Sequence, residues 1–143
     1  MMSITLDQAR TVIEGALTKA RSLDLKPVSV MVLDNRGSIV AAASEDGVSA
    51  MRAKIAHGKA NAAIQLGMGT RALMNRAEQQ AYFIQAMNGL AGGDMVPVPG
   101  GVLLRNLSGD LLGAVGISGD TSDNDEAAAL GGIEAADLIA ETG

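Results

Sequence analysis

Residues 97–119 read PVPGGVLLRNLSGDLLGAVGISG and contain two apolar runs joined by a polar turn. The runs, 102–105 and 111–117, are rich in side chains that favour strands. Residues 108–110 between them are Ser-Gly-Asp, which is ordinary turn chemistry. The pattern therefore predicts an antiparallel hairpin in the last third of the chain.

A pair of glycines, Gly100 and Gly101, follows Pro99 directly before the first of these strands. Without a side chain, glycine lets the backbone bend sharply or lets a ligand approach it closely. Two interpretations stay open, a hinge that packs tightly against the sheet and the backbone wall of a pocket. If the protein binds a small molecule, we expect these three residues to contribute to its site.

A second hairpin is predicted nearer the N-terminus. Residues 28–33 and 39–43 are rich in strand formers, and Asp-Asn-Arg-Gly at 34–37 separates them. This signal predicts a tight turn with Gly37 in a left-handed or bulged conformation. A further short strand is predicted at 95–98, so the sheet should have five strands.

Helices are predicted around these hairpins. A capping-box pattern of Thr5 and Gln8 begins a helix over 5–22. A second helix, 49–67, carries small residues three and four apart, which would let it approach a sheet closely: Ala53, Ala56, Ala60, Ala63 and Gly67. Residues 71–87 contain further helical sequence without a clear apolar face.

An acidic run, Asp-Thr-Ser-Asp-Asn-Asp-Glu at 120–126, precedes an Ala-rich helix predicted over 127–140. Acidic side chains suit a helix N-terminus, with the N-cap at Ser122 or at Asp123. A calcium loop of the EF-hand type would need an internal glycine and a terminal bidentate glutamate, and the run lacks both. We therefore interpret the run as a helix cap.

The predicted order is helix, hairpin, one or two helices, a strand, a hairpin and a final helix. This order predicts an α+β fold with a five-stranded antiparallel sheet packed against helices. With 143 residues, of which 48% are hydrophobic, the chain can bury one sizeable core. A single domain over 1–143 is the expectation.

Composition excludes several classes of function. The formal net charge of −5 argues against a nucleic acid or an anionic membrane as partner. The absence of cysteine excludes disulfides and thiolate metal sites. The first residues lack a secretion signal, and no window reaches the roughly 18 apolar residues that a membrane-spanning helix needs. We expect a cytoplasmic protein.

Four segments and the acidic-capped final helix together resemble the GlcG/HbpS family of small heme-binding proteins, which is related to the C-terminal domain of PduO. The segments are VLDNRGSIVAAAS at 32–44, RAKIAHGKANAA at 52–63, PVPGGVLLR at 97–105 and GDLLGAVGISG at 109–119. The resemblance extends from about Thr5 to Ile139. One departure is Leu103, which stands where family members commonly have proline.

The resemblance implies a five-stranded antiparallel sheet related to profilin-like folds, and self-assembly into dimers or larger rings. It also implies binding of heme or a related iron ligand, as in some members, and a place in a catabolic operon. We therefore expect a homo-oligomer that binds or senses a small ligand, with heme as the cofactor that the family suggests.

The helix predicted over 49–67 holds the densest group of basic and polar residues: Arg52, Lys54, His57, Lys59 and Asn61. His57 is the only histidine, so it is the only imidazole available as a heme ligand or near-neutral base. Arg52 and Lys59 share a helix face and are candidates to bind a carboxylate, whereas His57 lies on another side. A solvated histidine without function is the alternative for His57.

Two further hypotheses use the same residues or none of them. In a cofactor-free isomerase, hydratase or lyase, His57 would act as general base and Arg52 or Lys59 would anchor a small carboxylate. The amides of Gly100 and Gly101 would then donate to a developing oxyanion. A non-catalytic assembly module would need only the Ala- and Gly-rich faces.

Overall fold

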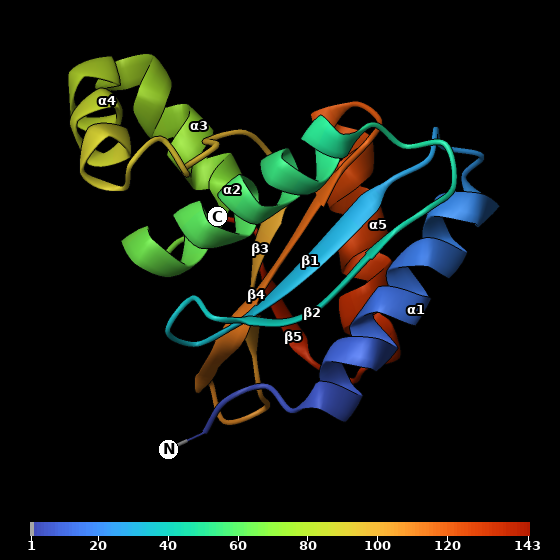
Figure 1. Cartoon of the computed structure of the whole chain (residues 1–143). Helices are drawn as coiled ribbons and strands as arrows, with labels where there is room; N and C mark the ends of the chain where they lie inside the picture. The colour runs from blue at the N-terminus through green and yellow to red at the C-terminus, as the bar shows by residue number, and fades with distance from the viewer. Residues whose placement is uncertain (1) are drawn as a thin grey trace.

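The computed structural model describes residues 2–143. Within that range the chain forms five helices and five strands (Figure 1). In chain order they are α1 (Leu6–Ser22), β1 (Ser29–Asp34), β2 (Ile39–Ser44), α2 (Ala50–Leu66), α3 (Thr70–Gln79), α4 (Ala81–Leu90), β3 (Gly101–Arg105), β4 (Leu111–Ser118), α5 (Ser122–Ala135) and β5 (Ile139–Glu141).

The strands form one antiparallel sheet in the order β2-β1-β4-β3-β5. Helices α1 and α5 pack against each other and cover one face, while α2 covers the other over β1, β4 and β3. Helices α3 and α4 project beside α2, away from the sheet (Figure 1). The α+β prediction with a five-stranded antiparallel sheet is confirmed.

Both predicted hairpins are present. β3 pairs with β4 from Gly101 opposite Gly116 to Arg105 opposite Leu111. β1 pairs with β2, and Gly37 in their turn has a φ of +98°, a conformation that favours glycine. The capping box that was predicted for the first helix is also present at its N-terminus.

The predicted strand at 95–98 is wrong, since this segment pairs with no strand. The N–H of Val96 donates to the carbonyl of Gly58 on α2, at 3.1 Å. Pro97 and Pro99 have no N–H for a ladder. The fifth strand is β5 at the C-terminus, where a helix was predicted.

The final helix ends at Ala135 rather than near residue 140. Asp137 adopts a left-handed φ of 56°, and the N–H of Leu138 returns to the carbonyl of Ile133 at 3.1 Å. This pattern is a Schellman cap, which turns the chain out of the helix and into β5. The N-cap also differs from the prediction, because the side chain of Thr121 accepts from the N–H of Asn124.

Residues 71–87, for which no register was predicted, belong to two helices. Gln80 separates α3 from α4 with a non-helical φ of −138° and ψ of 60°.

Among residues 2–143, no helix is both long enough and apolar enough to cross a membrane.

Helix α2 lies in close contact with the sheet because small residues meet there. A methyl group on Gly116 of β4 would overlap the carbonyl oxygen of Ala56 and lie 2.8 Å from the nitrogen of Ala60. The stripe of alanines predicted for this helix is therefore its sheet-facing side, and Ala56, Ala60 and Ala63 are fully buried.

We predict that Gly116→Ala lowers the free energy of unfolding by about 1–3 kcal/mol, since the added methyl group pushes α2 off the sheet. The matched control is Gly89→Ala in α4, where an added methyl group meets no atom within 4 Å. Alanine has a higher helix propensity than glycine, so Gly89→Ala should stabilise the protein by up to about 1 kcal/mol. Urea unfolding followed by circular dichroism measures both, and equal stabilities would contradict the close packing.

Candidate functional site

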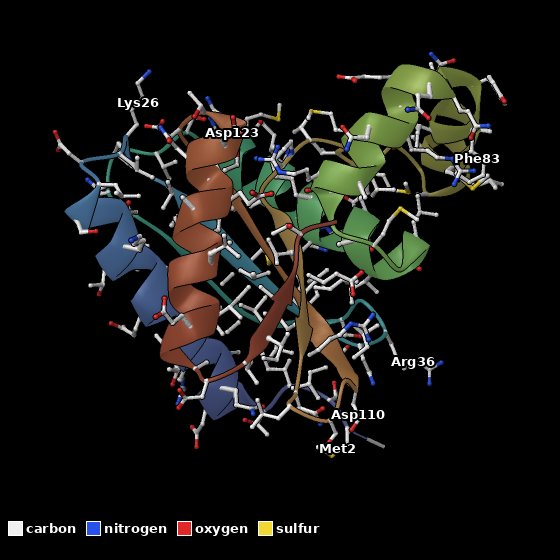
Figure 2. All side chains as sticks on the ribbon, turned by 180° about the vertical axis from the view of Figure 1, so that it is seen from behind. Met2, Lys26, Arg36, Phe83, Asp110 and Asp123 are labelled. Atoms are coloured by element: carbon white, nitrogen blue, oxygen red, sulfur yellow. The ribbon has the colours of Figure 1, made fainter. Side chains whose placement is uncertain are left out.

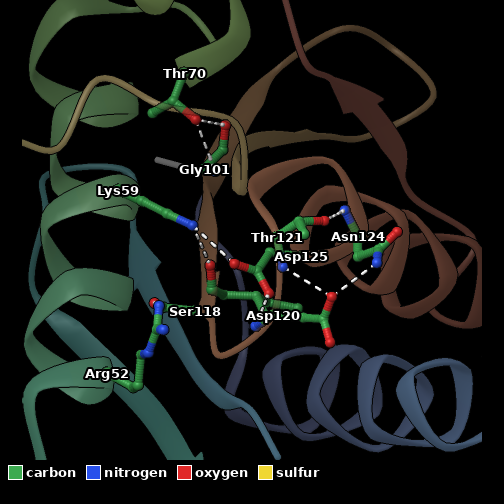
Figure 3. Close-up of polar contacts among 10 residues, drawn as sticks. Arg52, Lys59, Thr70, Gly101, Ser118, Asp120, Thr121, Asn124 and Asp125 are labelled. Atoms are coloured by element: carbon green, nitrogen blue, oxygen red, sulfur yellow. Dashed lines mark hydrogen bonds and ion pairs between the residues drawn. The ribbon is translucent and has the colours of Figure 1, made fainter. Parts of the chain in front are cut away.

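Lys59, which we expected to bind a ligand carboxylate, lies in the protein interior. Its Nζ donates to Asp125 Oδ2 at 3.1 Å and to the carbonyl of Ile117 at 2.9 Å (Figure 3). The side chains of Lys59 and Asp125 are 2% and 1% exposed. The carboxylate partner of Lys59 is therefore a residue of the same chain.

The glycine pair before β3 forms one wall around this lysine. A side chain on Gly100 would lie 2.8 Å from Lys59 Nζ, and one on Gly101 would overlap the Lys59 carbonyl oxygen. The N–H of Gly101 donates to Thr70 Oγ1 at 2.8 Å (Figure 3). Gly100 has a φ of +122°, and Pro99 before it is buried. The pair is thus packed against α2, and the Gly101 amide is already hydrogen-bonded.

Burial lowers the pKa of Lys59, and Asp125 opposes that effect through its charge and its hydrogen bond. Arg52 adds to the lowering through like-charge repulsion, and its Nη1 donates to Ser118 Oγ at 3.3 Å. The second oxygen of Asp125, Oδ1, accepts from the N–H of Asp120 at 2.9 Å. This buried pair joins α2 to the first turn of α5.

His57 lies elsewhere on α2, at a cavity of about 380 Å³. The cavity is lined by Met51, Lys54, Ile55, His57, Gly92, Gly93, Asp94 and Val96. His57 Nδ1 is 2.8 Å from Asp94 Oδ2, and the histidine side chain is 25% exposed. A histidine and a carboxylate thus meet at the edge of an open and partly apolar hollow.

The loop that carries Asp94 is attached to α2 by hydrogen bonds. Asn61 Nδ2 donates to the Asp94 carbonyl at 2.9 Å. Gly92 and Gly93 have φ values of 71° and 87°, which glycine adopts without strain and which turn the chain from α4 toward α2. The sequence therefore fixes the carboxylate of Asp94 beside His57 through a glycine turn and an asparagine.

This contact defines the chemistry that His57 can offer. A carboxylate only accepts hydrogen bonds, so Nδ1 carries the proton at the contact with Asp94. In the neutral ring, Nε2 then keeps its lone pair and is available as a metal ligand or as a base. A carboxylate on the second nitrogen also orients the ring and makes the ligating nitrogen more basic.

The predicted site residues fall into two groups on different sides of α2. His57 and Asn61 meet at Asp94, and Asn61 also borders a second cavity of about 410 Å³ between α2 and α4. Lys59, Gly100 and Gly101 meet at the buried pair instead. No group of three or more histidine, cysteine or acidic side chains that could hold a metal ion occurs within residues 2–143.

Two acidic partners were not identified from the sequence. Asp94 follows Gly92 and Gly93, so its local sequence is typical of a turn residue. Asp125 was assigned to a helix cap, whereas it points inward to Lys59. Nothing in the local sequence separates Asp125 from the acidic residues around it, because its partner is 66 positions away.

A family model described as "Haem degrading protein HbpS-like" matches residues 4–134. The chain belongs to the HbpS-like family. This confirms the resemblance found in its sequence. No curated protein sequence matches the chain.

Solved structures share this HbpS-like fold over almost the whole chain. A PduOC:heme complex has a TM-score of 0.86 at 22% identity and covers 96% of this chain and 98% of its own. The Klebsiella pneumoniae protein ORFY has a TM-score of 0.84 at 23% identity, with coverages of 95% and 92%. A double mutant of Streptomyces reticuli HbpS has a TM-score of 0.78 at 24% identity, with coverages of 94% and 87%.

For this HbpS-like protein we predict that Lys59→Met lowers the free energy of unfolding by about 3–5 kcal/mol, because Asp125 loses its buried counter-charge. The matched control is Lys54→Met on the exposed side of the same helix, where the change should stay within about 0.5 kcal/mol. Guanidinium unfolding measures both variants. A Lys59→Met protein as stable as the control would show that the pair contributes nothing.

Proposed function

We propose that this protein binds heme at the His57 cavity, with Nε2 of His57 as the axial ligand to iron. The contact of 2.8 Å between His57 Nδ1 and Asp94 Oδ2 carries the proposal. Histidine ligands to metals in proteins commonly donate their other ring N–H to a carboxylate or carbonyl in this way. Membership of a family described by haem degradation supports the same ligand.

The residues around His57 fit such a group. Met51, Ile55 and Val96 give the cavity apolar walls suited to a porphyrin face, and Met51 is 60% exposed. Lys54 supplies a cation at the same cavity, which suits a propionate of the porphyrin. Lys54 replaces Lys59 in this role, because Lys59 is occupied in the interior.

Heme, when bound, would supply an iron centre for ligand binding or redox chemistry. The protein's own part is to hold the His57 ring through Asp94 and to shield one porphyrin face with apolar side chains. Binding of this kind is the step that any haem-degrading activity requires. As part of the same proposal, we infer a cytoplasmic homo-oligomer that binds or senses heme, encoded beside genes of a catabolic pathway.

We predict that titration with hemin gives a shifted Soret band that saturates at stoichiometric heme. His57→Ala should lose this spectrum, and added imidazole should restore it by replacing the missing ligand. Asp94→Asn should keep the spectrum but bind heme about 10–100-fold more weakly.

The matched control is Gln65→Ala, since Gln65 is exposed on the same helix and does not line the His57 cavity. It should bind heme like the wild type. An unchanged Soret band in His57→Ala would show that another residue ligates the iron, and no band shift in the wild type would refute heme binding.

The histidine–carboxylate contact also favours a second candidate, a cofactor-free isomerase, hydratase or lyase with His57 as general base. Asp94 would orient the ring, and Lys54 would bind the carboxylate of a small substrate.

For this enzyme candidate we predict that the protein, without heme, converts an intermediate of the catabolic pathway encoded by the neighbouring genes. His57→Ala should then lower kcat by about 10²–10⁴-fold, and retained turnover would exclude His57 as the base.

A further inference from the structure

The cavity of about 410 Å³ between α2 and α4 is separate from the His57 cavity. We call it the α2–α4 cavity, and it is lined by Asn61, Gln65, Leu66, Met87, Leu90, Ala91 and Met95. The loop over residues 91–96 lies between the two cavities and contributes residues to both, but the cavities share no lining residue. A molecule in the α2–α4 cavity therefore need not contact His57.

The apolar wall of the α2–α4 cavity belongs to a small hydrophobic cluster. The buried centre of this cluster consists of Ala62, Leu73, Ile84 and Met95. Leu66, Met87 and Ala91 of the cavity wall pack against this centre, as does Phe83 in the part of the molecule that α3 and α4 form (Figure 2). Leu90 at the rim is 82% exposed. An apolar ligand would extend the cluster and remove Leu90 from water, which is favourable.

Hydrogen bonds hold the walls of the cavity in place. The N–H of Met95 donates to Asn88 Oδ1 on α4 at 3.1 Å. Asn61 Nδ2 on α2 donates to the carbonyl of Asp94 at 2.9 Å, and the N–H of Val96 also bonds to α2. The loop is thus attached to both helices that border the cavity. A ligand would not have to order this loop, so binding avoids that entropic cost.

Two side-chain amides form the polar side of the cavity. Gln65 Nε2 donates to Asn61 Oδ1 at 3.2 Å. Gln65 Oε1 accepts no hydrogen bond from the residues that the structure describes, and each amide nitrogen carries a second N–H. The pair can therefore both accept a hydrogen bond from a ligand and donate one. A hydroxyl or amide group answers both, whereas a carboxylate only accepts.

The charge around the cavity excludes an ionic ligand. None of its lining residues is charged. Arg76, in the last turn of α3, is engaged elsewhere: its guanidinium lies 4.2 Å from the centre of the Phe83 ring, and its Nε donates to Gln80 Oε1 at 2.6 Å. A carboxylate in the cavity would lose hydration without gaining a counter-charge, which is costly.

We propose that the α2–α4 cavity is a binding site for a small uncharged molecule that has an apolar body and one hydroxyl or amide group. The apolar body packs against Leu66, Met87 and Met95, and the polar group exchanges hydrogen bonds with Gln65. The volume lies at the small end of the range of about 300–1,000 Å³ that is usual for ligand sites. This site does not depend on heme binding at His57.

Hexanamide and hexanoate test the proposal as a pair of probes, because they have the same apolar chain and differ in charge. Methyl NMR of protein labelled with 13C at its methionine methyl groups reports binding. Hexanamide should shift the signals of Met87 and Met95 and leave that of Met51, which lines the His57 cavity, unchanged. Hexanoate should bind roughly tenfold more weakly or worse, because its charge is unpaired there.

A charged variant reverses this preference without disturbing the core. Leu90→Lys places a cation at the rim, so hexanoate should bind about two- to fivefold more tightly than to the wild type, and hexanamide more weakly. The matched control is Tyr82→Lys, since Tyr82 is 71% exposed on the same helix and does not line the cavity. It should bind both probes like the wild type.

Three results would overturn the proposal, and none of them involves heme. Hexanamide could leave the Met87 and Met95 signals unchanged, or it could shift the Met51 signal equally. Wild-type protein could also bind hexanoate as tightly as hexanamide, which would show that charge does not select the ligand.

Discussion

The buried ion pair of Lys59 and Asp125 joins elements on opposite faces of the sheet. Lys59 belongs to α2, and Asp125 belongs to the first turn of α5. Nζ also binds the carbonyl of Ile117, so the end of β4 is held between the two helices. A charge in this position is costly unless it is paired, which constrains the residues around it to leave room for the pair. Gly100 and Gly101 satisfy that constraint.

Because Lys59 points into the interior, the two sides of α2 have different surroundings. With Lys59 turned inward, the helix presents Met51, Lys54, Ile55 and His57 to the cavity beside the loop of Asp94. That loop depends on α2 in turn, through Asn61 and the carbonyl of Gly58. The sheet-facing alanines set the position of the helix, and the helix then fixes both the buried pair and the His57 cavity.

The sequence predicts the elements that depend on local signals. Both hairpins and the first helix follow from turn residues, strand formers and a capping box, and the alanine stripe of α2 meets the sheet as expected. The errors occur where tertiary contacts override local pattern. Residues 95–98 bind α2 instead of a strand, and the Ala-rich C-terminus leaves its helix at a Schellman cap to complete the sheet with β5.

In the candidate site too, the local sequence identifies one residue and misses its tertiary partner. His57 could be selected because it is the only histidine in the chain, but its partner Asp94 is 37 positions away and resembles any turn aspartate. The proposed role of Asp94 is to hold His57 as an iron ligand. Resonance Raman spectra of the ferrous heme complex test it most directly. We expect an iron–histidine stretching band that moves to lower frequency in Asp94→Asn, because the neutral amide makes the histidine a weaker ligand. Absence of this band would show that His57 does not ligate the iron, and a band that Asp94→Asn does not change would show that Asp94 does not act on the ligand.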